Sequence, residues 1–167
     1  MTVSKRILFQ IALAVLALIG LAANGLYSQF RLAVMAQNFA MSDYPRLITL
    51  GRFSDAVYGL RLTGLHALTS TRDGDRKAAQ ADVKASYDAA KQAIGAYAGM
   101  INDDEDRGLN NKDLQLLDQY HDAQTPMLDA AARNDLKGAR KLRTDSVTPA
   151  GDALRTNILA HIDYNKR

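Results

Sequence analysis

The segment Val83–Ile101, with the sequence VKASYDAAKQAIGAYAGMI, determines the fold class. Its apolar and aromatic residues recur at alternating steps of four and three, which places them on one face of an α-helix. The residues on this face are Val83, Tyr87, Ala90, Ile94, Tyr97 and Ile101. The segment therefore predicts a long helix that buries this face against neighbouring helices.

The rest of the chain beyond about residue 30 has the same helical character. No segment there alternates apolar with polar residues at period two, so no strand is expected. Clusters of Gly, Asn and Asp interrupt the helical pattern at residues 71–75, 102–108 and 133–135. These breaks predict an all-α, up-down-up-down four-helix bundle. The expected helices span about residues 31–71, 74–102, 105–133 and 135–166.

The three prolines mark expected departures from straight helices. Pro126 lies inside the third predicted helix and should kink it, because proline cannot donate a helical hydrogen bond. Pro149 should bend the fourth helix or mark a restart after Asp145 and Ser146. Pro45 follows Tyr44 at the expected bend of the first bundle helix, which we predict to continue from the N-terminal segment.

The N-terminal segment Ile7–Leu26 is mostly apolar and long enough to cross a bilayer. About twenty residues at about 1.5 Å per residue cover the roughly 30 Å hydrocarbon core. Lys5 and Arg6 precede the segment and mark its cytoplasmic end. We therefore predict a protein of the bacterial inner membrane with a cytoplasmic N-terminus (1–6), a transmembrane helix (7–30) and a periplasmic domain (31–167).

A cleaved signal peptide is the alternative interpretation of this segment, since Ala22 and Ala23 could supply a cleavage site. Residues 31–167 are exported under either interpretation. The whole chain has a formal net charge of +3 with interspersed charges, so nucleic acid is not an expected partner. The chain has no cysteine, which excludes disulfides, thiolate metal sites and covalent haem attachment.

The sequence offers no catalytic or metal-binding motif. His66, His121 and His161 fall at heights in the predicted bundle that differ by roughly 10 to 30 Å, so they cannot share a metal ion within one chain. The acidic run Asp103–Asp106 lacks the spaced ligands of a calcium loop and indicates helix capping instead. No nucleophile has a base nearby, and no glycine-rich loop suits phosphate. We expect no metal, no cofactor and no enzymatic activity.

Arg61 is the strongest candidate for ligand binding, because its helical neighbours are small or apolar and its guanidinium therefore needs a partner. The partner is either a nearby Asp, with the side chain otherwise in solvent, or the carboxylate of a ligand. Counted from the turn near residue 73, the predicted bundle places other hydrogen-bonding groups at the same depth as Arg61. The candidate ligand-binding residues at or near this level are Arg61, His66, Ser70, Tyr87, Tyr120 and Thr148.

The chain resembles the four-helix-bundle ligand-binding domain of methyl-accepting chemotaxis receptors over essentially its whole length. The resemblance rests on the apolar N-terminal segment and on the order and spacing of Asp43–Arg46, Asp55–Arg61 with Leu65 and Leu68, Ile101–Arg107, Leu117, Tyr120, Ala139–Pro149 and Asn165. It implies a sensor for signal transduction in chemotaxis. It further implies a homodimer, a second membrane span after Arg167, and a ligand-driven shift of the fourth helix.

In the amino-acid receptors of this family, arginines on the first bundle helix bind the ligand carboxylates. Arg61 matches the first arginine, whereas the other two positions hold His66 and Ser70, and Thr148-Pro149 reverses a Pro-Thr pair. The resemblance therefore implies a small anionic ligand that is an organic, aromatic or amino acid. The alternative is a membrane-tethered helical protein-interaction module with no small-molecule ligand.

Overall fold

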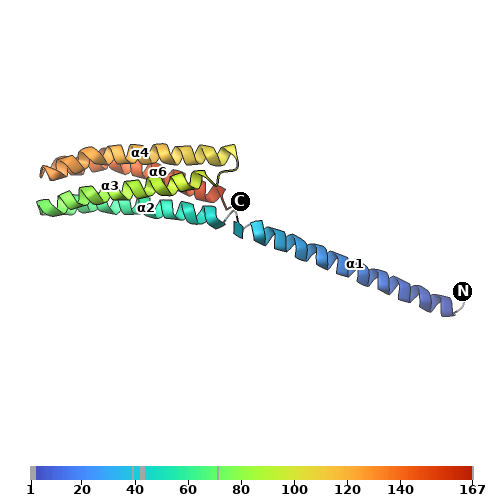
Figure 1. Ribbon diagram of the computed structural model, residues 1–167. Coiled ribbons are helices and arrows are strands. Elements are labelled where there is room, and N and C mark those ends of the chain that lie inside the picture. The colour runs from blue at the N-terminus through green and yellow to red at the C-terminus, as the bar shows by residue number, and fades with distance from the viewer. Residues whose placement is uncertain (1–2, 39, 42–43, 71, 167) are drawn as a thin grey trace. The chain divides into compact units, whose positions relative to one another are not determined.

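The computed structural model describes residues 3–38, 40–41, 44–70 and 72–166, which form helices and no strand (Figure 1). The all-α prediction is confirmed. The elements are α1 (Val3–Asn38), α2 (Tyr44–Thr69), α3 (Asp73–Ala98), α4 (Asp104–Ala132), α5 (Leu136–Leu142), η2 (Arg143–Val147) and α6 (Thr148–Tyr164). They divide into two compact units, residues 1–42 and residues 43–167.

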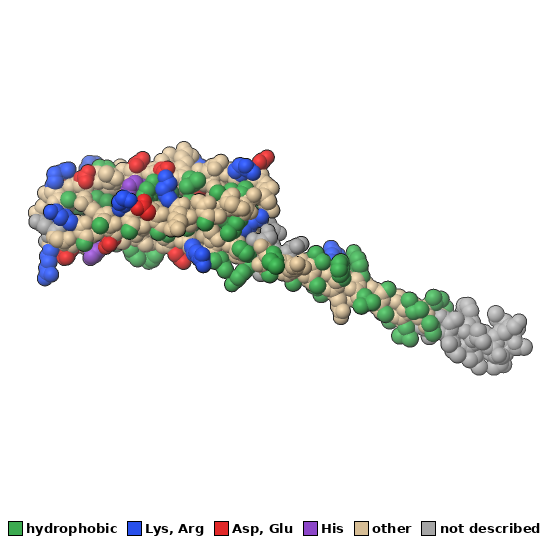
Figure 2. All heavy atoms as spheres, viewed as in Figure 1, with side chains coloured by type: hydrophobic (Ala, Val, Ile, Leu, Met, Phe, Trp, Pro, Cys, Tyr) green, Lys and Arg blue, Asp and Glu red, His purple; other side chains and the backbone are tan. Residues whose placement is uncertain are grey.

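The first unit contains α1, whose described side chains from Leu13 onward are mostly exposed and apolar (Figure 2). Leu16, Leu21 and Phe30 are each more than 60% exposed. Among the residues that the structure describes, no helix combines the length and apolar character needed to cross a membrane. The transmembrane helix predicted at residues 7–30 is therefore not confirmed. The predicted continuity with the first bundle helix runs through residues 39, 42 and 43, which lie outside the described residues.

The second unit is a bundle of four antiparallel rods (Figure 1). The rods are α2, α3, α4 and the succession α5–η2–α6. Helix α2 packs along α3, α3 packs along α4, and α4 packs along α6, while α2 also contacts α4 and α6. We name the end that carries the α2–α3 and α4–α5 connections the tip. The base is the opposite end, with the start of α2, the α3–α4 connection and the end of α6.

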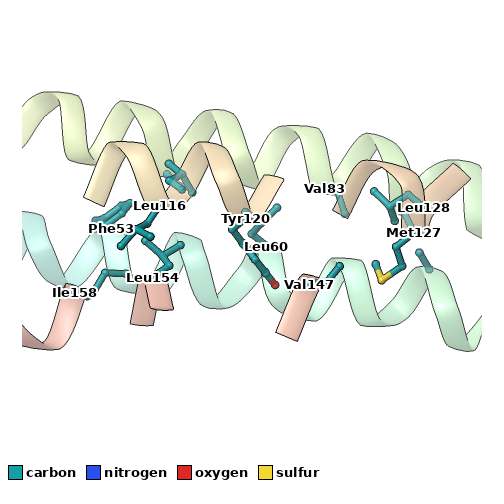
Figure 3. Close-up of a cluster of buried hydrophobic side chains, with 14 of the residues drawn as sticks. Phe53, Leu60, Val83, Leu116, Tyr120, Met127, Leu128, Val147, Leu154 and Ile158 are labelled. Atoms are coloured by element: carbon teal, nitrogen blue, oxygen red, sulfur yellow. The ribbon is translucent and has the colours of Figure 1, made fainter. Parts of the chain in front are cut away.

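The core confirms the helix face on which the fold prediction rests. Val83, Ala90, Ile94 and Tyr97 of α3 are at most 1% exposed. Other core side chains converge from the remaining rods, with Phe53 of α2 near Leu116 and Leu154 in Figure 3. Burial of such side chains contributes about 1.5–3 kcal/mol each before conformational entropy is subtracted, so this face holds the rods together.

The helix ends follow from local chemistry. The Asp103 side chain accepts a hydrogen bond from the Asp106 N–H at 2.8 Å, as predicted for a cap of α4. Asp135 likewise caps α5 through the Gly138 N–H at 2.8 Å. Helix α4 continues through Pro126 as a single helix. Helix α3 ends at Ala98, four residues before the expected end at 102, because the chain turns at Gly99.

The fourth rod contains the predicted restart at Pro149. Residues Arg143–Val147 form one π-helical stretch, and the Thr148 N–H bonds the Arg143 carbonyl five residues earlier. Helix α6 then begins at Thr148, with Pro149 in its first turn, where proline is tolerated. The π-helical stretch therefore rotates α6 relative to α5, and it borders the cavities described next.

Candidate functional site

Two adjoining hollows lie between α2 and α6, with side chains of α4 as their floor. The first measures about 50 Å³ and is lined by Arg61, Tyr120, Gln124, Arg143 and Thr148 among others. The second measures about 140 Å³ and extends toward the base. Arg61, Tyr120 and Gly151 line both hollows, and Arg155 lines the second. We call the two hollows together the α2–α6 groove.

Two glycines let the outer helices approach the floor of the groove. A Cβ atom on Gly151 of α6 would lie 2.9 Å from Cε2 of Tyr120, and one on Gly64 of α2 would lie 2.6 Å from Nε2 of Gln124. Both distances are shorter than any normal Cβ contact, so a larger residue would displace the floor side chains. The absence of side chains at these two glycines therefore leaves the space that the floor of the groove occupies.

The floor carries buried polar groups with unused hydrogen-bonding capacity. Tyr120 is 3% exposed and Gln124 is 1% exposed. Gln124 Nε2 donates to the Leu60 carbonyl at 3.3 Å and to the Tyr120 hydroxyl at 3.2 Å. Among the described residues, no acceptor receives the Tyr120 hydroxyl proton and no donor reaches Gln124 Oε1. A polar ligand could use both atoms, because buried polar groups are normally hydrogen-bonded.

Tyr120 remains a hydrogen-bond donor at neutral pH. Burial raises the pKa of its hydroxyl, although the positive charges of Arg61 and Arg143 act in the opposite direction. The protonated hydroxyl can therefore donate to an anion held by these arginines.

Acidic residues neutralise little of the positive charge of the arginines around the groove. Arg61 Nη1 lies 3.7 Å from Asp152 Oδ1, and these two side chains are 50% and 58% exposed, so the pair contributes little to stability. Arg143 and Arg155 form no ion pair within the described part of the chain. The pairing of Arg61 with an Asp, one of the two outcomes expected from sequence, is thus present in a weak form. The excess positive charge favours an anionic occupant.

The structure brings together three of the six residues predicted to bind a ligand. Arg61, Tyr120 and Thr148 all line the first hollow. Ser70 is buried and lines a third hollow, at the tip. His66 is exposed on α2 and is not among the residues that line the groove. Arg61, Tyr120 and Thr148, predicted at one depth, line one hollow, but depth alone does not decide which face of a helix a side chain occupies.

Tyr87 does not join the groove, because its own partners hold it between α3 and α4. Its hydroxyl donates to Asp118 Oδ1 at 2.7 Å, and its ring stacks on that of His121 with centroids 4.0 Å apart. Lys91 Nζ lies 3.1 Å from Asp118 Oδ1 and 5.4 Å from the centre of the Tyr87 ring. Burial and the bond to Asp118 raise the pKa of Tyr87. These contacts join α3 to α4 and explain Tyr87 without a ligand.

A buried charged cluster at the base was not predicted. His161 of α6 lies between two aspartates of α4, with Nδ1 2.6 Å from Asp113 Oδ2 and Nε2 2.8 Å from Asp106 Oδ1. All three side chains are 0% exposed. We call these three residues the base cluster.

Further hydrogen bonds surround the base cluster, although Asp106 Oδ2 is buried without a partner among the described residues. The Tyr97 hydroxyl donates to Asp106 Oδ1 at 2.7 Å, and Asn157 Nδ2 donates to Asp113 Oδ1 at 2.8 Å. Asn165 Nδ2 reaches Asp106 Oδ1 at 3.4 Å. Beside the cluster, the Tyr164 hydroxyl donates to Asp103 Oδ1 at 2.8 Å, which raises the pKa of Tyr164 to about 12. Three helices therefore meet through charge-assisted hydrogen bonds.

His161 is positively charged over a wider pH range than an ordinary histidine. Burial alone would lower the pKa of its imidazole, but the bonds to Asp113 and Asp106 outweigh that effect and raise the pKa. The pKa of Tyr97 is raised by burial and by its bond to Asp106. The cluster is closed to solvent and joins α6 to α4.

One sequence signal could have indicated the base cluster. Asp106, Asn110 and Asp113 are spaced by four and three, which continues the apolar stripe of α4 toward its N-terminus. Polar residues on a buried stripe require partners, and a histidine near the end of the antiparallel neighbouring helix is a suitable one. Attributing the acidic run to capping was right for Asp103 but incomplete for Asp106.

Comparison with known proteins assigns a sensory role to this architecture. A sequence profile of the family described as a four helix bundle sensory module for signal transduction matches residues 1–167. No curated protein has a sequence that matches this chain.

Proposed function

Because the chain belongs to the family of four-helix-bundle sensory modules for signal transduction, found in chemotaxis receptors, we propose that it binds a small anionic ligand in the α2–α6 groove. The ligand class is an organic, aromatic or amino acid. Binding would bias the position of α6, and the receptor would pass that change across the inner membrane from a periplasmic sensor domain. No catalytic step is involved.

The observation that carries this proposal is the set of donors around the first hollow. Arg61 and Arg143 line it together with the Tyr120 hydroxyl, whose proton has no acceptor among the described residues. A carboxylate that enters the hollow could receive bonds from a guanidinium and from the hydroxyl, with Thr148 at the rim. The excess of arginine over aspartate around the groove supports an anion rather than a neutral or cationic ligand.

The membrane location rests on the family and on the sequence. Receptors that contain this module are membrane proteins, and the apolar segment Ile7–Leu26 follows Lys5 and Arg6. This arrangement supports an N-terminus in the cytoplasm and a bundle in the periplasm. The ligand produces a signal if it binds one position of α6 more tightly than another. The typical coupling free energy between ligand binding and such a shift is about 1–3 kcal/mol.

We propose that the bundle acts as a dimer through an apolar stripe on α2. Tyr58, Leu62 and Leu65 recur at steps of four and three, and they are 63%, 49% and 37% exposed. Tyr58 and Leu65 also line the groove beside Arg61. A second copy of the chain on this stripe would bury these side chains and cover the groove. The same stripe is the observation that favours the second candidate, a protein-interaction module without a ligand.

The test is a thermal-shift screen of the purified 167-residue protein against organic, aromatic and amino acids. A ligand that binds only the folded state raises the melting temperature, and at about one hundred times its Kd it adds roughly 2.7 kcal/mol of stability. We expect a shift with at least one acid, and we expect Arg61→Gln to abolish it. Arg52→Gln is the matched control, because Arg52 is also exposed on α2 but does not line the groove.

The outcomes separate the two candidate functions. A shift that survives in Arg61→Gln would reject the proposed site. No shift with any acid, from protein that unfolds cooperatively, would favour the protein-interaction module.

A further inference from the structure

A third hollow lies at the tip and adjoins the α2–α6 groove. It measures about 550 Å³, and its lining includes Ser70, Asn134, Arg140 and Arg143. Leu65, Leu68 and Arg143 line both this hollow and the first hollow of the groove, so the two spaces are neighbours along α2. We call this third space the tip hollow.

The tip hollow is electropositive. Its lining contains no aspartate or glutamate among the described residues. Arg140 and Arg143 are both exposed and form no ion pair with any described residue. The acidic residues near them in sequence are engaged elsewhere, since Asp135 caps α5 and Asp145 pairs with Lys141.

The spacing of Arg140 and Arg143 adds to the case for an anion. Side chains three residues apart in a helical segment project from the same side, so these two guanidinium groups repel each other when no anion lies between them. The buried Arg76 side chain also lines the hollow, where its Nη1 donates to the Ala131 carbonyl at 3.1 Å and to Asn134 Oδ1 at 2.8 Å. An anion bound here would remove the repulsion between Arg140 and Arg143, and the wall that contacts it is already formed.

We infer that the groove and the tip hollow form one site for a ligand with two anionic groups, such as a dicarboxylate. One carboxylate lies with Arg61 and the Tyr120 hydroxyl, and the other lies with Arg143 and Arg140. Arg143 can serve as the link because it lines both spaces. This inference rests on the proposed function and specifies the ligand class of the same site.

The test compares straight-chain dicarboxylates from malonate to adipate with the monocarboxylates of equal carbon number. Isothermal titration calorimetry on the purified protein gives Kd for each. We expect the best dicarboxylate to bind at least about tenfold more tightly than its matched monocarboxylate, because a second set of charge-assisted hydrogen bonds forms. Arg140→Gln should remove this advantage by weakening the binding of the dicarboxylate to the level of its matched monocarboxylate. Arg133→Gln, which alters an exposed arginine at the tip outside this lining, is the matched control.

The results distinguish failure of this inference from failure of the proposed function. Monocarboxylates and dicarboxylates that bind equally, both dependent on Arg61, would overturn the two-anion site and leave the proposed function standing. An unchanged dicarboxylate Kd in Arg140→Gln would overturn the assignment of the second anionic group to the tip hollow. Binding of neither series to folded protein would overturn both.

Discussion

Replacing His161 by Leu tests whether the base cluster contributes as much stability as its geometry indicates. The substitution keeps a side chain of moderate volume but removes the cation between Asp106 and Asp113. Both carboxylates are 0% exposed, so no water replaces the lost partner without a rearrangement of the base. Each hydrogen bond to a charged group contributes about 1.5–3 kcal/mol, and breaking a buried ion pair typically costs about 3–5 kcal/mol. We therefore expect the free energy of unfolding to fall by about 3–5 kcal/mol.

The assay is urea unfolding at pH 6, followed by far-ultraviolet circular dichroism. The midpoint should fall while the slope of the transition stays near that of the parent protein, because the surface exposed on unfolding is similar. His121→Leu is the matched control. His121 lies on the α3–α4 face, where it stacks on Tyr87 outside the base cluster, so its replacement should cost about 1 kcal/mol or less.

A double-mutant cycle makes the result decisive. If His161 acts through Asp113, then His161→Leu combined with Asp113→Asn should be much less destabilised than the sum of the single variants. A loss below about 1 kcal/mol in His161→Leu, similar to that in the His121→Leu control, would refute the reasoning that the cluster is a charged structural unit.

Two further predictions concern the pH dependence of stability and the oligomeric state. Because the pKa of His161 is raised in the folded state, its contribution to stability is fully present below the unfolded-state pKa of about 6.5. That contribution is lost as the pH rises through the higher folded-state pKa. The decline in unfolding free energy above about pH 6.5 should therefore be steeper in the parent protein than in His161→Leu. Equal slopes in the two proteins would contradict this assignment. Sedimentation of the purified protein should show a dimer, and Leu62→Asp should weaken it. Ala85→Asp, which alters an exposed position on α3, should leave the dimer intact. Equal behaviour of the two variants would exclude the α2 stripe as the interface.

The fold could be predicted because its determinants are local. The stripe that includes Val83, Ile94 and Tyr97 identifies a bundle helix from residues within one segment, and all three side chains are buried. The cap at Asp103 and the restart at Pro149 also follow from neighbouring residues. Counting residues from the tip then placed Arg61, Tyr120 and Thr148 at one depth, and they line one hollow.

The remaining features depend on contacts between distant segments. Counting residues gives the height of Tyr87 but not its direction, which is set by Asp118 on the neighbouring helix, 31 residues away. The bond between Asp113 and His161 joins residues 48 apart, and neither segment alone identifies the partner that its polar group binds. Arg140 and Arg143 were missed for a similar reason, since η2 determines how α5 and α6 are rotated and no local propensity indicates a π-helical turn.

The base cluster constrains how a signal could leave the proposed site. Asn157 and His161 of α6 and Asn165 directly after it recur every four residues, and each bonds an aspartate of α4. Sliding α6 by one or two ångströms along α4 would stretch bonds of 2.6–2.8 Å beyond hydrogen-bonding distance and separate buried charges. Tyr97 of α3 also bonds Asp106 at 2.7 Å, so helices α3, α4 and α6 should move together at the base. The displacement of α6 that we propose would then take place between these three helices and α2, on the side where the α2–α6 groove lies.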